Sequence, residues 1–458
     1  MVFSILFGDM VSRRRFLRNT AAFASSVIAS SSAFSEECKG VLTEAQRAIP
    51  FCEKYDIIVC GAGPAGIGAA LSSARLGMKT LVIESGGCLG GTWTRGQLSW
   101  IFDFKKDGIS KEIISKLNER NAKHGGNDKD FVYEPDAMKL ILEEMLTEAG
   151  VDILMFTQCV SASVVNGKLR AVITESKSGR MAWGAKIFID CTGDGDVAAR
   201  AGAEFEMGEG AERLVQPCTF NAIVTVKDVD RLSDKISAYK KDTLKGHLAA
   251  TQKTLQELQS IGIDPSYHHP TLFHIGGNML LMMFNHEYGV HCDSATEITA
   301  ATIRARKEIY KIADALAKKG GAWEGLRVIA TSEHIGIREG RRVKGLYTVT
   351  IDDALAGRKF DDAVCRVTFN VDLHAPTKSD NVKRALKNIH TKPYDIPLRA
   401  LICRDIDCLM MAGRCISGDR IVHGSYRVTG NAVQMGYAAG QAAADFIKRG
   451  VSPHSLKA

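Results

Sequence analysis

The chain of 458 residues has no uninterrupted apolar run that approaches the roughly 20 residues of a membrane-spanning helix. Its hydrophobic content of 45% and charged content of 24% are those of a soluble globular protein. We therefore exclude a protein with several membrane spans and expect no stable membrane insertion. We expect two or three domains, because single hydrophobic cores stop growing at roughly 250–300 residues.

The chain also has little excess charge of one sign. Its formal net charge is +7, and +3 of this belongs to residues 1–35, which leaves +4 spread over the rest of the chain. No dense basic run is present. Because nucleic-acid binding depends on clustered Lys and Arg, we expect no nucleic-acid partner.

The sequence also lacks the residue spacings that are typical of metal sites and of disulfide frameworks. Five histidines lie between residues 268 and 291, but none forms an HxxxH or HxH arrangement with a carboxylate at ligand spacing, so we expect no metal site. The twelve cysteines are spread over a chain long enough to fold without disulfides. We interpret Cys403 and Cys408, which bracket four residues, as packing cysteines.

What the N-terminal 35 residues do contain is a targeting pattern. The stretch SRRRFLRN precedes the weakly hydrophobic run TAAFASSVIASSSAFS, which ends in a small-x-small site. The pair Arg13 and Arg14, with Phe16 and Leu17, is similar to a twin-arginine signal. This similarity implies that the twin-arginine machinery exports the folded protein to the periplasm or another extracytoplasmic space. The alternative is the basic tail of a cytoplasmic protein.

Residues 55–84 predict a nucleotide-binding βαβ unit. The apolar strand YDIIVC precedes GAGPAG, in which Gly61, Gly63 and Gly66 have GxGxxG spacing. The first glycine permits a tight turn, the second lets a pyrophosphate approach the backbone, and the third lets the following helix pack on the strand. The helix AGIGAALSSARLG and the strand KTLVIE follow, and Glu84 lies where an acidic side chain accepts hydrogen bonds from ribose hydroxyls.

This unit alone does not distinguish NAD from FAD. A second glycine-rich loop, SGGCLGGTWTRGQ, follows Glu84 at a point where a nicotinamide-dependent dehydrogenase usually continues with further βα units. No second GxGxxG occurs in the chain, so we expect no separate domain for NAD(P)H. We therefore expect oxygen, a quinone or a small redox carrier as the electron acceptor.

Three later segments, together with residues 55–100, resemble the FAD-dependent oxidoreductases of the glutathione-reductase-like superfamily. They are FIDCTGDGDVAARAGAEFEMG, HIGIREGRRVKGLYTVT and PYDIPLRALICRDIDCLMMAGRCISGDRIVHGSYRVTGNAVQMGYAAGQAAA. The resemblance implies FAD as the cofactor. It also implies FAD contacts at Gly61, Gly63, Ala65, Gly66, Glu84, Ser85, Gly90, Gly91, Thr92, Val160, Thr192, Gly193, Asp194, Gly413 and Arg414.

We predict an α/β fold, with a doubly wound, Rossmann-like FAD-binding domain assembled from N- and C-terminal segments and an inserted α+β substrate domain. The predicted parts are a targeting segment at 1–35, a linker at 36–54, the first part of the FAD-binding domain at 55–204, the inserted domain at 205–330 and the return to the FAD-binding domain at 331–458. We expect the active site at the junction of the two domains.

Helices and sheet are predicted within the inserted part. Residues 235–262 and 294–320 have helical spacing, the second with Ser294 as its N-cap, and residues 269–290 alternate like sheet. Near the C-terminus, CLMMAG predicts a buried strand and residues 430–447 a helix rich in Gly and Ala. Those small residues permit either the approach of a bulky ligand or tight helix packing.

His423, Ser425 and Arg427 are the predicted catalytic residues. They alternate in RIVHGSYRVTG, so that an extended stretch would point all three the same way. Oxidation of a C–H bond beside oxygen or nitrogen needs a base for the heteroatom proton and a group that holds the substrate. We predict His423 as the base and Arg427 as the anchor for an anionic or carbonyl oxygen. The alternative is a structural His423 and an Arg427 paired with a carboxylate.

Further candidates lie in IREGRRV and in the second glycine-rich loop. Arg338, Arg341 and Arg342 suit either an acidic substrate or a salt-bridged scaffold, and His334 shares that ambiguity. Cys88 suits a covalent flavin link, a redox thiol or simple packing.

The expected function is FAD-dependent oxidation or reduction of a small organic substrate, by hydride transfer to or from the flavin, in an exported protein. The alternatives are a flavin-binding protein without turnover and monooxygenase-type chemistry with a separate reductase.

Overall fold

A five-stranded parallel sheet forms the centre of the computed structural model, which describes residues 42, 44, 47–106, 108–241, 244–383 and 389–457. Its strand order is β20-β11-β2-β3-β7, and every neighbouring pair is parallel. Its strands are β2 (Ile57–Cys60), β3 (Thr80–Ile83), β7 (Asp152–Leu154), β11 (Ile187–Asp190) and β20 (Leu409–Met411). All but β7 are fully buried, as expected for apolar runs in a parallel sheet. The predicted α/β fold is confirmed.

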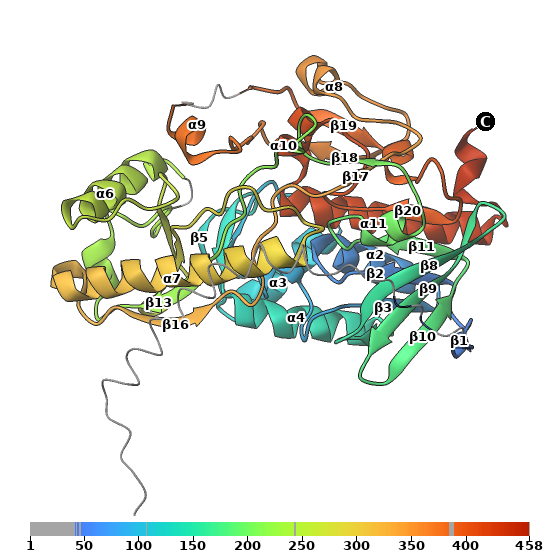
Figure 1. The fold of residues 1–458 in the computed structure, drawn as a ribbon, viewed down its shortest axis with the longest axis horizontal. Coiled ribbons are helices and arrows are strands. Elements are labelled where there is room, and N and C mark those ends of the chain that lie inside the picture. The colour runs from blue at the N-terminus through green and yellow to red at the C-terminus, as the bar shows by residue number, and fades with distance from the viewer. Residues whose placement is uncertain are drawn as a thin grey trace, which may run out of the picture. The chain divides into compact units, whose positions relative to one another are not determined.

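The C-terminal segment completes the sheet that the N-terminal segment begins. Strand β20 pairs with β11, and helix α11 (Thr429–Lys448) packs along helix α2 (Pro64–Arg75), as Figure 1 shows. This packing is close enough to require glycine. A Cβ at Gly436 would lie 1.8 Å from the carbonyl oxygen of Ala65, and one at Gly68 would lie 2.2 Å from that of Val433. Of the two explanations for the small residues of this helix, these contacts favour tight helix packing.

A second core lies in the chain's middle third. The antiparallel sheet β14-β15-β13-β16 comprises β13 (Ala222–Thr225), β14 (Thr271–His274), β15 (Met279–Met283) and β16 (Arg327–Thr331). With helices α6 (His247–Ser260) and α7 (Ala295–Lys319) it buries its own cluster of apolar side chains, which includes Leu258, Leu280, Ile309 and Trp323. The domain boundaries at 205 and 330 stay a prediction.

The two helices predicted in this region have different outcomes. Helix α7 is confirmed, and the Ser294 hydroxyl accepts a hydrogen bond from the Glu297 N–H as its N-cap. The helix predicted over residues 235–262 is wrong in its first half, because α6 begins only at His247. Lys240 and Gly246 have φ values of 50° and 92°, a left-handed backbone that ends any helix before that point.

The remaining strands among the described residues form four further sheets. Strands β1 (Phe51–Cys52), β8 (Gln158–Val165), β9 (Lys168–Ser176) and β10 (Gly179–Gly184) form a sheet that adds Leu169 and Val172 to the main core. The other elements are β4 (Trp100–Ile101), β5 (Lys123–Gly126), β6 (Phe131–Tyr133), β12 (Phe205–Glu206), β17 (Arg342–Val343), β18 (Ala363–Val367), β19 (Tyr394–Pro397), α3 (Ile109–Glu119), α4 (Pro135–Glu148), α5 (Asp196–Arg200), α8 (Ile351–Ala356), α9 (Lys378–Lys383) and α10 (Arg420–Tyr426).

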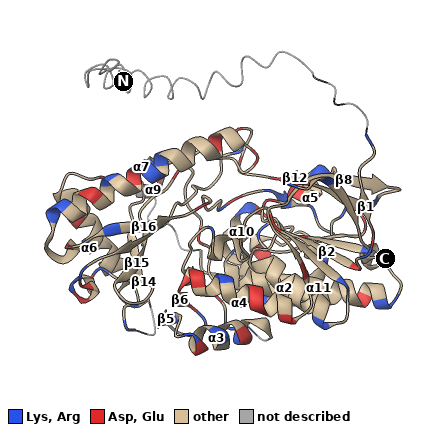
Figure 2. Cartoon of the chain, turned by 90° about the horizontal axis from the view of Figure 1, so that it is seen from below, with Lys and Arg blue, Asp and Glu red and all other residues tan. Residues whose placement is uncertain are grey.

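Several predictions from composition concern features of the whole chain. The predicted targeting segment, residues 1–35, lies outside the described residues. Within the described ranges no helix is long and apolar enough to cross a membrane, and every described cysteine is free. Acidic and basic residues are interspersed along helices α3 and α7, whereas the charged residues of α4 are mostly acidic (Figure 2).

Candidate functional site

The glycine-rich turn after β2 forms one wall of a cavity of about 390 Å³. Gly61 has a φ of 92°, and a Cβ there would lie 2.5 Å from the carbonyl oxygen of Cys191. A Cβ at Gly66 would lie 1.9 Å from the carbonyl oxygen of Gly61, so this glycine lets α2 pack against the turn. At Gly63, in contrast, a Cβ would meet no atom within 4 Å. The glycine at this position therefore leaves space that the protein itself does not fill.

Glu84, at the end of β3, joins the two glycine-rich loops. Its Oε2 accepts the N–H of Ala62, and its Oε1 accepts the N–H of Gly86 and the guanidinium of Arg95 at 2.9 Å. Arg95 also pairs with Glu333 at 3.2 Å. Because a carboxylate has about four acceptor positions, Oε2 retains one for a ligand hydroxyl.

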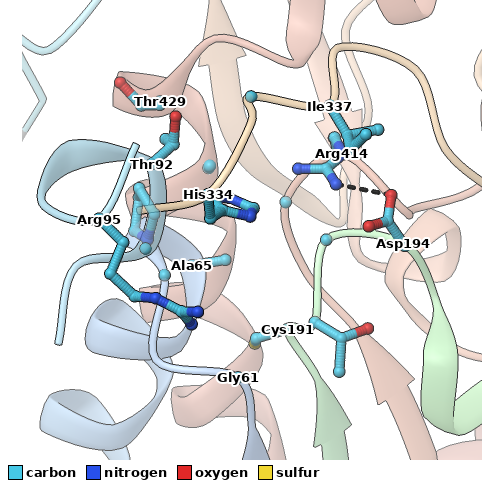
Figure 3. A pocket seen from close by; sticks show the side chains of 18 of the residues that line it. Gly61, Ala65, Thr92, Arg95, Cys191, Asp194, His334, Ile337, Arg414 and Thr429 are labelled. Atoms are coloured by element: carbon cyan, nitrogen blue, oxygen red, sulfur yellow. Dashed lines mark hydrogen bonds and ion pairs between the residues drawn. The ribbon is translucent and has the colours of Figure 1, made fainter. Parts of the chain in front are cut away.

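The third wall comes from the ends of β11 and β20. Asp190 accepts hydrogen bonds from the N–H and hydroxyl of Thr192, which fixes the turn over residues 191–194. Arg414 pairs with Asp194 at 2.6 Å (Figure 3). Burial raises the pKa of Asp194, and the guanidinium of Arg414 opposes this effect.

Most of the predicted cofactor-binding residues line this cavity. Those that do are Gly61, Gly63, Ala65, Glu84, Ser85, Gly91, Thr92, Thr192, Gly193, Asp194, Gly413 and Arg414. Three do not. Gly66 packs against the turn. Gly90 has a φ of 101° and donates its N–H to the carbonyl oxygen of Ala62. Val160 lies outside the cavity wall, which its neighbour Cys159 lines instead.

The predicted catalytic stretch is not extended, and this expectation is wrong. Asp419 accepts hydrogen bonds from the N–H groups of Ile421 and Val422, both at 2.8 Å, and so caps helix α10. His423 is fully buried within that helix and does not line the cavity. Ser425 is buried as well and donates its hydroxyl to the carbonyl oxygen of Phe369.

Of the three predicted catalytic residues, Arg427 alone lines the cavity. It follows α10 and donates to the carboxylate of Asp372 at 3.2 Å. Burial lowers its pKa to about 10, and Asp372 opposes the shift, so Arg427 remains charged at neutral pH. The pairing matches the alternative in which Arg427 neutralises a carboxylate.

Burial governs the titration of the two candidate histidines, His423 and His334. It lowers the pKa of His423 well below its ordinary value, reinforced by nearby arginines such as Arg342. His334 does line the cavity, where burial together with Arg95 and Arg414 lowers its pKa to about 4. Figure 3 shows its ring between Arg95 and Arg414. His334 is thus neutral at physiological pH and able to accept a proton.

Of the other candidate residues, the three arginines and Cys88, only one lines the cavity. Arg338 lines the cavity, whereas Arg341 pairs with Asp196 and Arg342 with the buried Glu339, both at 3.0 Å. Cys88 does not line it, and its thiol lies 3.7 Å from the hydroxyl of Thr94. No group of three His, Cys, Asp or Glu side chains in the described part of the chain is arranged to hold a metal ion.

Several cavity residues were missed from the sequence. Thr219 and Asn221 lie in the segment before β13, and Met283 ends β15. Further wall residues are Thr157, Gln158, Ile337, Thr429 and Ala432. None of them was singled out from the sequence, because long-range topology brings them together. Thr429 begins α11, whose N-terminus has no side-chain cap.

A family model described as FAD dependent oxidoreductase matches residues 56–458. The chain belongs to this family. The protein is therefore an FAD-dependent oxidoreductase, with FAD as its cofactor.

The cavity of this FAD-dependent oxidoreductase fits its cofactor. Helix α2 begins at the cavity with no side-chain cap and no acidic residue in its first turn, so its N–H groups and positive dipole end suit a pyrophosphate. The unfilled space at Gly63 lies at that helix end. Glu84 offers an acceptor for the ribose, and Arg414, paired with Asp194, lines the opposite part of the cavity.

The curated relatives match only in part. The FAD-dependent oxidoreductase is 47% identical over 47 residues to a dihydrolipoyl dehydrogenase of Trypanosoma brucei brucei, a match that covers 10% of each chain. It is 24% identical over 198 residues to a digeranylgeranylglycerophospholipid reductase of Methanocella arvoryzae, which covers 39% of this chain and 45% of the relative. The chain thus spans less than half the length of either relative.

Two solved structures are similar at low identity. A geranylgeranyl bacteriochlorophyll reductase-like protein from Thermoplasma acidophilum has 16% identity and a TM-score of 0.45, with 88% of this chain and 80% of that chain covered. A p-nitrophenol 4-monooxygenase from Pseudomonas putida has 11% identity and a TM-score of 0.46, with 89% and 83% covered. At these values neither likeness bears on the substrate.

Proposed function

We propose that the protein transfers a hydride between the flavin and a small organic substrate bound in the same cavity. The observation that carries this proposal is the continuity of the cavity. Its walls include both glycine-rich loops and also Thr219, Asn221 and Met283, which belong to the second sheet and its approach. A site that only bound a dinucleotide would not need this further wall, which gives a substrate a place beside the cofactor.

His334 is proposed as the group that exchanges the substrate's heteroatom proton. FAD supplies the hydride acceptor or donor when it is bound. His334 lies in the cavity and, with its pKa lowered to about 4, presents a free imidazole lone pair at neutral pH. No hydrogen bond to its ring is present among the residues that the structure describes. It therefore replaces His423 as the candidate base.

We further propose that the protein works outside the cytoplasm after export by the twin-arginine pathway. Arg13 and Arg14 support this, and FAD loading before translocation would explain why an exported chain carries a nucleotide-binding fold. Oxygen, a quinone or a small redox carrier is the proposed electron acceptor. Replacement of Arg13 and Arg14 by Lys should retain the precursor in the cytoplasm, and a processed, exported double variant would contradict the proposal.

Anaerobic rapid mixing tests the hydride transfer. The oxidised, FAD-loaded protein is mixed with small alcohols, polyols, amines and hydroxy acids, and the flavin absorbance is followed. The dithionite-reduced protein is mixed with the corresponding carbonyl and unsaturated compounds. We expect at least one class to change the flavin's redox state. Binding without any redox change across both panels would instead favour a flavin-binding protein without turnover.

A further inference from the structure

One of the four arginines that line the cavity differs from the rest in its partners. Arg95 pairs with Glu84 at 2.9 Å, Arg414 with Asp194 at 2.6 Å and Arg427 with Asp372 at 3.2 Å. Arg338 donates only to uncharged acceptors, which are the carbonyl oxygen of Pro217, the hydroxyl of Thr219 at 3.0 Å and the Nε2 of His286 at 3.4 Å. Over the described ranges, no carboxylate forms an ion pair with it.

The groups behind Arg338 add no negative charge. His286 is buried, stacks on Tyr267 with ring centroids 3.9 Å apart, and lies 5.1 Å from the ring of His374. Burial lowers the pKa of His286 well below its ordinary value and that of His374 to about 4, so both rings are neutral at physiological pH.

Asp372, a carboxylate whose pKa Arg338 lowers, is already paired with another group. Asp372 is paired with Arg427, and its Oδ1 lies 3.3 Å from the Nε2 of His374. Although burial favours the neutral acid, His374, Arg427 and Arg338 together hold the pKa of Asp372 well below its ordinary value. The single carboxylate of Asp372 therefore faces two guanidinium groups, those of Arg427 and Arg338. Since Arg427 pairs with it, the charge of Arg338 is left without an ion-pair partner at this end of the cavity.

Arg338 is held by residues from a different part of the chain than the nucleotide turn. Its three partners come from residues 217–219 and from His286, which lie in the chain's middle third, whereas the turn at Gly61–Gly66 belongs to the N-terminal segment. Partial burial of a guanidinium charge costs free energy unless an anion pairs with it, and a bound ligand can supply that anion. A carboxylate is suited to this role because it can accept two parallel hydrogen bonds from one guanidinium.

We propose that the substrate is an organic acid whose carboxylate is bound by Arg338. This inference rests on the proposed function, because it assigns the substrate class of the same cavity. The carboxylate would occupy the part of the cavity at Arg338, with Thr219 beside it. Arg338 holds the anion, and His334, four residues earlier in the chain, is positioned by the same segment to exchange the proton.

Equilibrium binding to the FAD-loaded protein tests the proposal. Acetate, lactate and benzoate, each with its matched amide, are titrated while the flavin spectrum is recorded. We expect at least one carboxylate to bind better than its amide. Because a hydrogen bond to a charged group is lost, we expect its dissociation constant to rise about 10- to 100-fold in Arg338→Gln and less in Arg338→Lys.

Arg306→Gln is the matched control. Arg306 is another guanidinium without a carboxylate partner over the described ranges; it lies over the ring of Phe220 and donates to Thr331, and it does not line the cavity. Its substitution should leave carboxylate binding unchanged. FAD content is measured for every variant, and Arg338→Gln should retain its FAD.

The proposal is overturned if no carboxylate binds, if the amides bind as well, or if Arg338→Gln binds the carboxylate as wild type does. The comparison of carboxylate with amide binding uses the wild-type protein only. If Arg338→Gln fails to fold, this comparison still tests whether the cavity prefers a carboxylate. A rate of substrate-dependent flavin reduction that is the same in Arg338→Gln as in wild type would refute this inference but not the proposed function. Carboxylate binding without flavin reduction would refute the proposed function alone.

Discussion

His334 and His423 differ in exposure to the cavity, and that difference assigns them different roles. Both are neutral because burial lowers their pKa, but His334 lines the cavity whereas His423 lies inside helix α10. A neutral imidazole acts as a base only where a substrate can reach it. The residue's position, rather than its chemical type, decides the assignment.

His334→Gln should reduce the rate of substrate-dependent flavin reduction by about 100- to 10,000-fold, the usual contribution of a general base. In wild type the rate should fall as the pH decreases through about 4, because protonation then removes the free base. Stopped-flow reduction over a pH series measures both effects. FAD content serves as the control and should stay at the wild-type level. An unchanged rate in His334→Gln would refute the role of this histidine.

His423→Gln should leave the rate of flavin reduction at saturating substrate within about twofold of wild type, because the ring does not reach the cavity. A lower thermal midpoint is expected, since both ring nitrogens lie in a fully buried site where a polar replacement rarely packs as well. Parallel stopped-flow and thermal-unfolding measurements separate the two effects. A selective loss of rate with unchanged stability would restore His423 as a catalytic residue.

At the scale of elements, the contact between α2 and α11 couples stability to cofactor binding. Helix α2 presents its N-terminus to the cavity, and α11 fixes α2 through backbone contacts that only glycine permits. Gly436 is the tightest of these positions, because its Cβ would lie 1.8 Å from the carbonyl oxygen of Ala65 at the start of α2.

Gly436→Ala should therefore destabilise the protein by about 1–3 kcal/mol, the usual cost of overpacking, and should weaken FAD binding by displacing the N-terminus of α2. Denaturant unfolding and FAD content measure the two effects. Gln441→Ala, at an exposed position of the same helix, is the control and should change neither. A stable Gly436→Ala variant with full FAD content would contradict this coupling.

Local sequence patterns predicted some helices and strands correctly and others wrongly. Continuous apolar runs and glycine spacing predicted β2, α2, β3, β20 and α11, because each has a local signal in turn chemistry or hydrophobicity. At residues 420–426 the two-residue spacing of polar side chains is misleading, because Asp419 caps a helix there. The helix expected from residue 235 was overextended across Gly246.

The candidate site was predictable on one side only. The walls formed by the glycine-rich loops carry motifs, so Gly61 and Glu84 could be named from the sequence, and Arg414 followed from the family resemblance of its segment. Met283 belongs to an ordinary strand and Asn221 directly precedes one, and both reach the cavity only through tertiary packing. No local pattern distinguishes such residues from others in the same sheet.

At the scale of the whole molecule, buried neutral histidines make stability depend on pH. His334 and His374 have a pKa of about 4 in the folded protein against an ordinary value of 6.5. The unfolded chain therefore binds protons between these values that the folded chain does not. Stability rises with pH wherever the unfolded state binds more protons.

We thus expect the free energy of unfolding to fall as the pH decreases from 6.5 to about 4. Urea unfolding at a series of pH values measures this dependence. Replacement of both His334 and His374 by Gln should make the dependence shallower in that window, whereas replacement of the exposed-loop residue His390 should not. A dependence unaltered by the double substitution would contradict the account.

The central claim is that the cavity at the N-terminus of α2 binds FAD, and the flavin content of Gly63→Val tests it most directly. Gly63 has an extended backbone that any residue adopts, and an added Cβ meets no protein atom within 4 Å, so the variant should fold. The visible absorbance per protein chain is compared for purified wild type and variant, and thermal unfolding of both apoproteins confirms the fold. We predict stoichiometric flavin in wild type and little in Gly63→Val. A folded Gly63→Val that retains its full flavin content would contradict the claim.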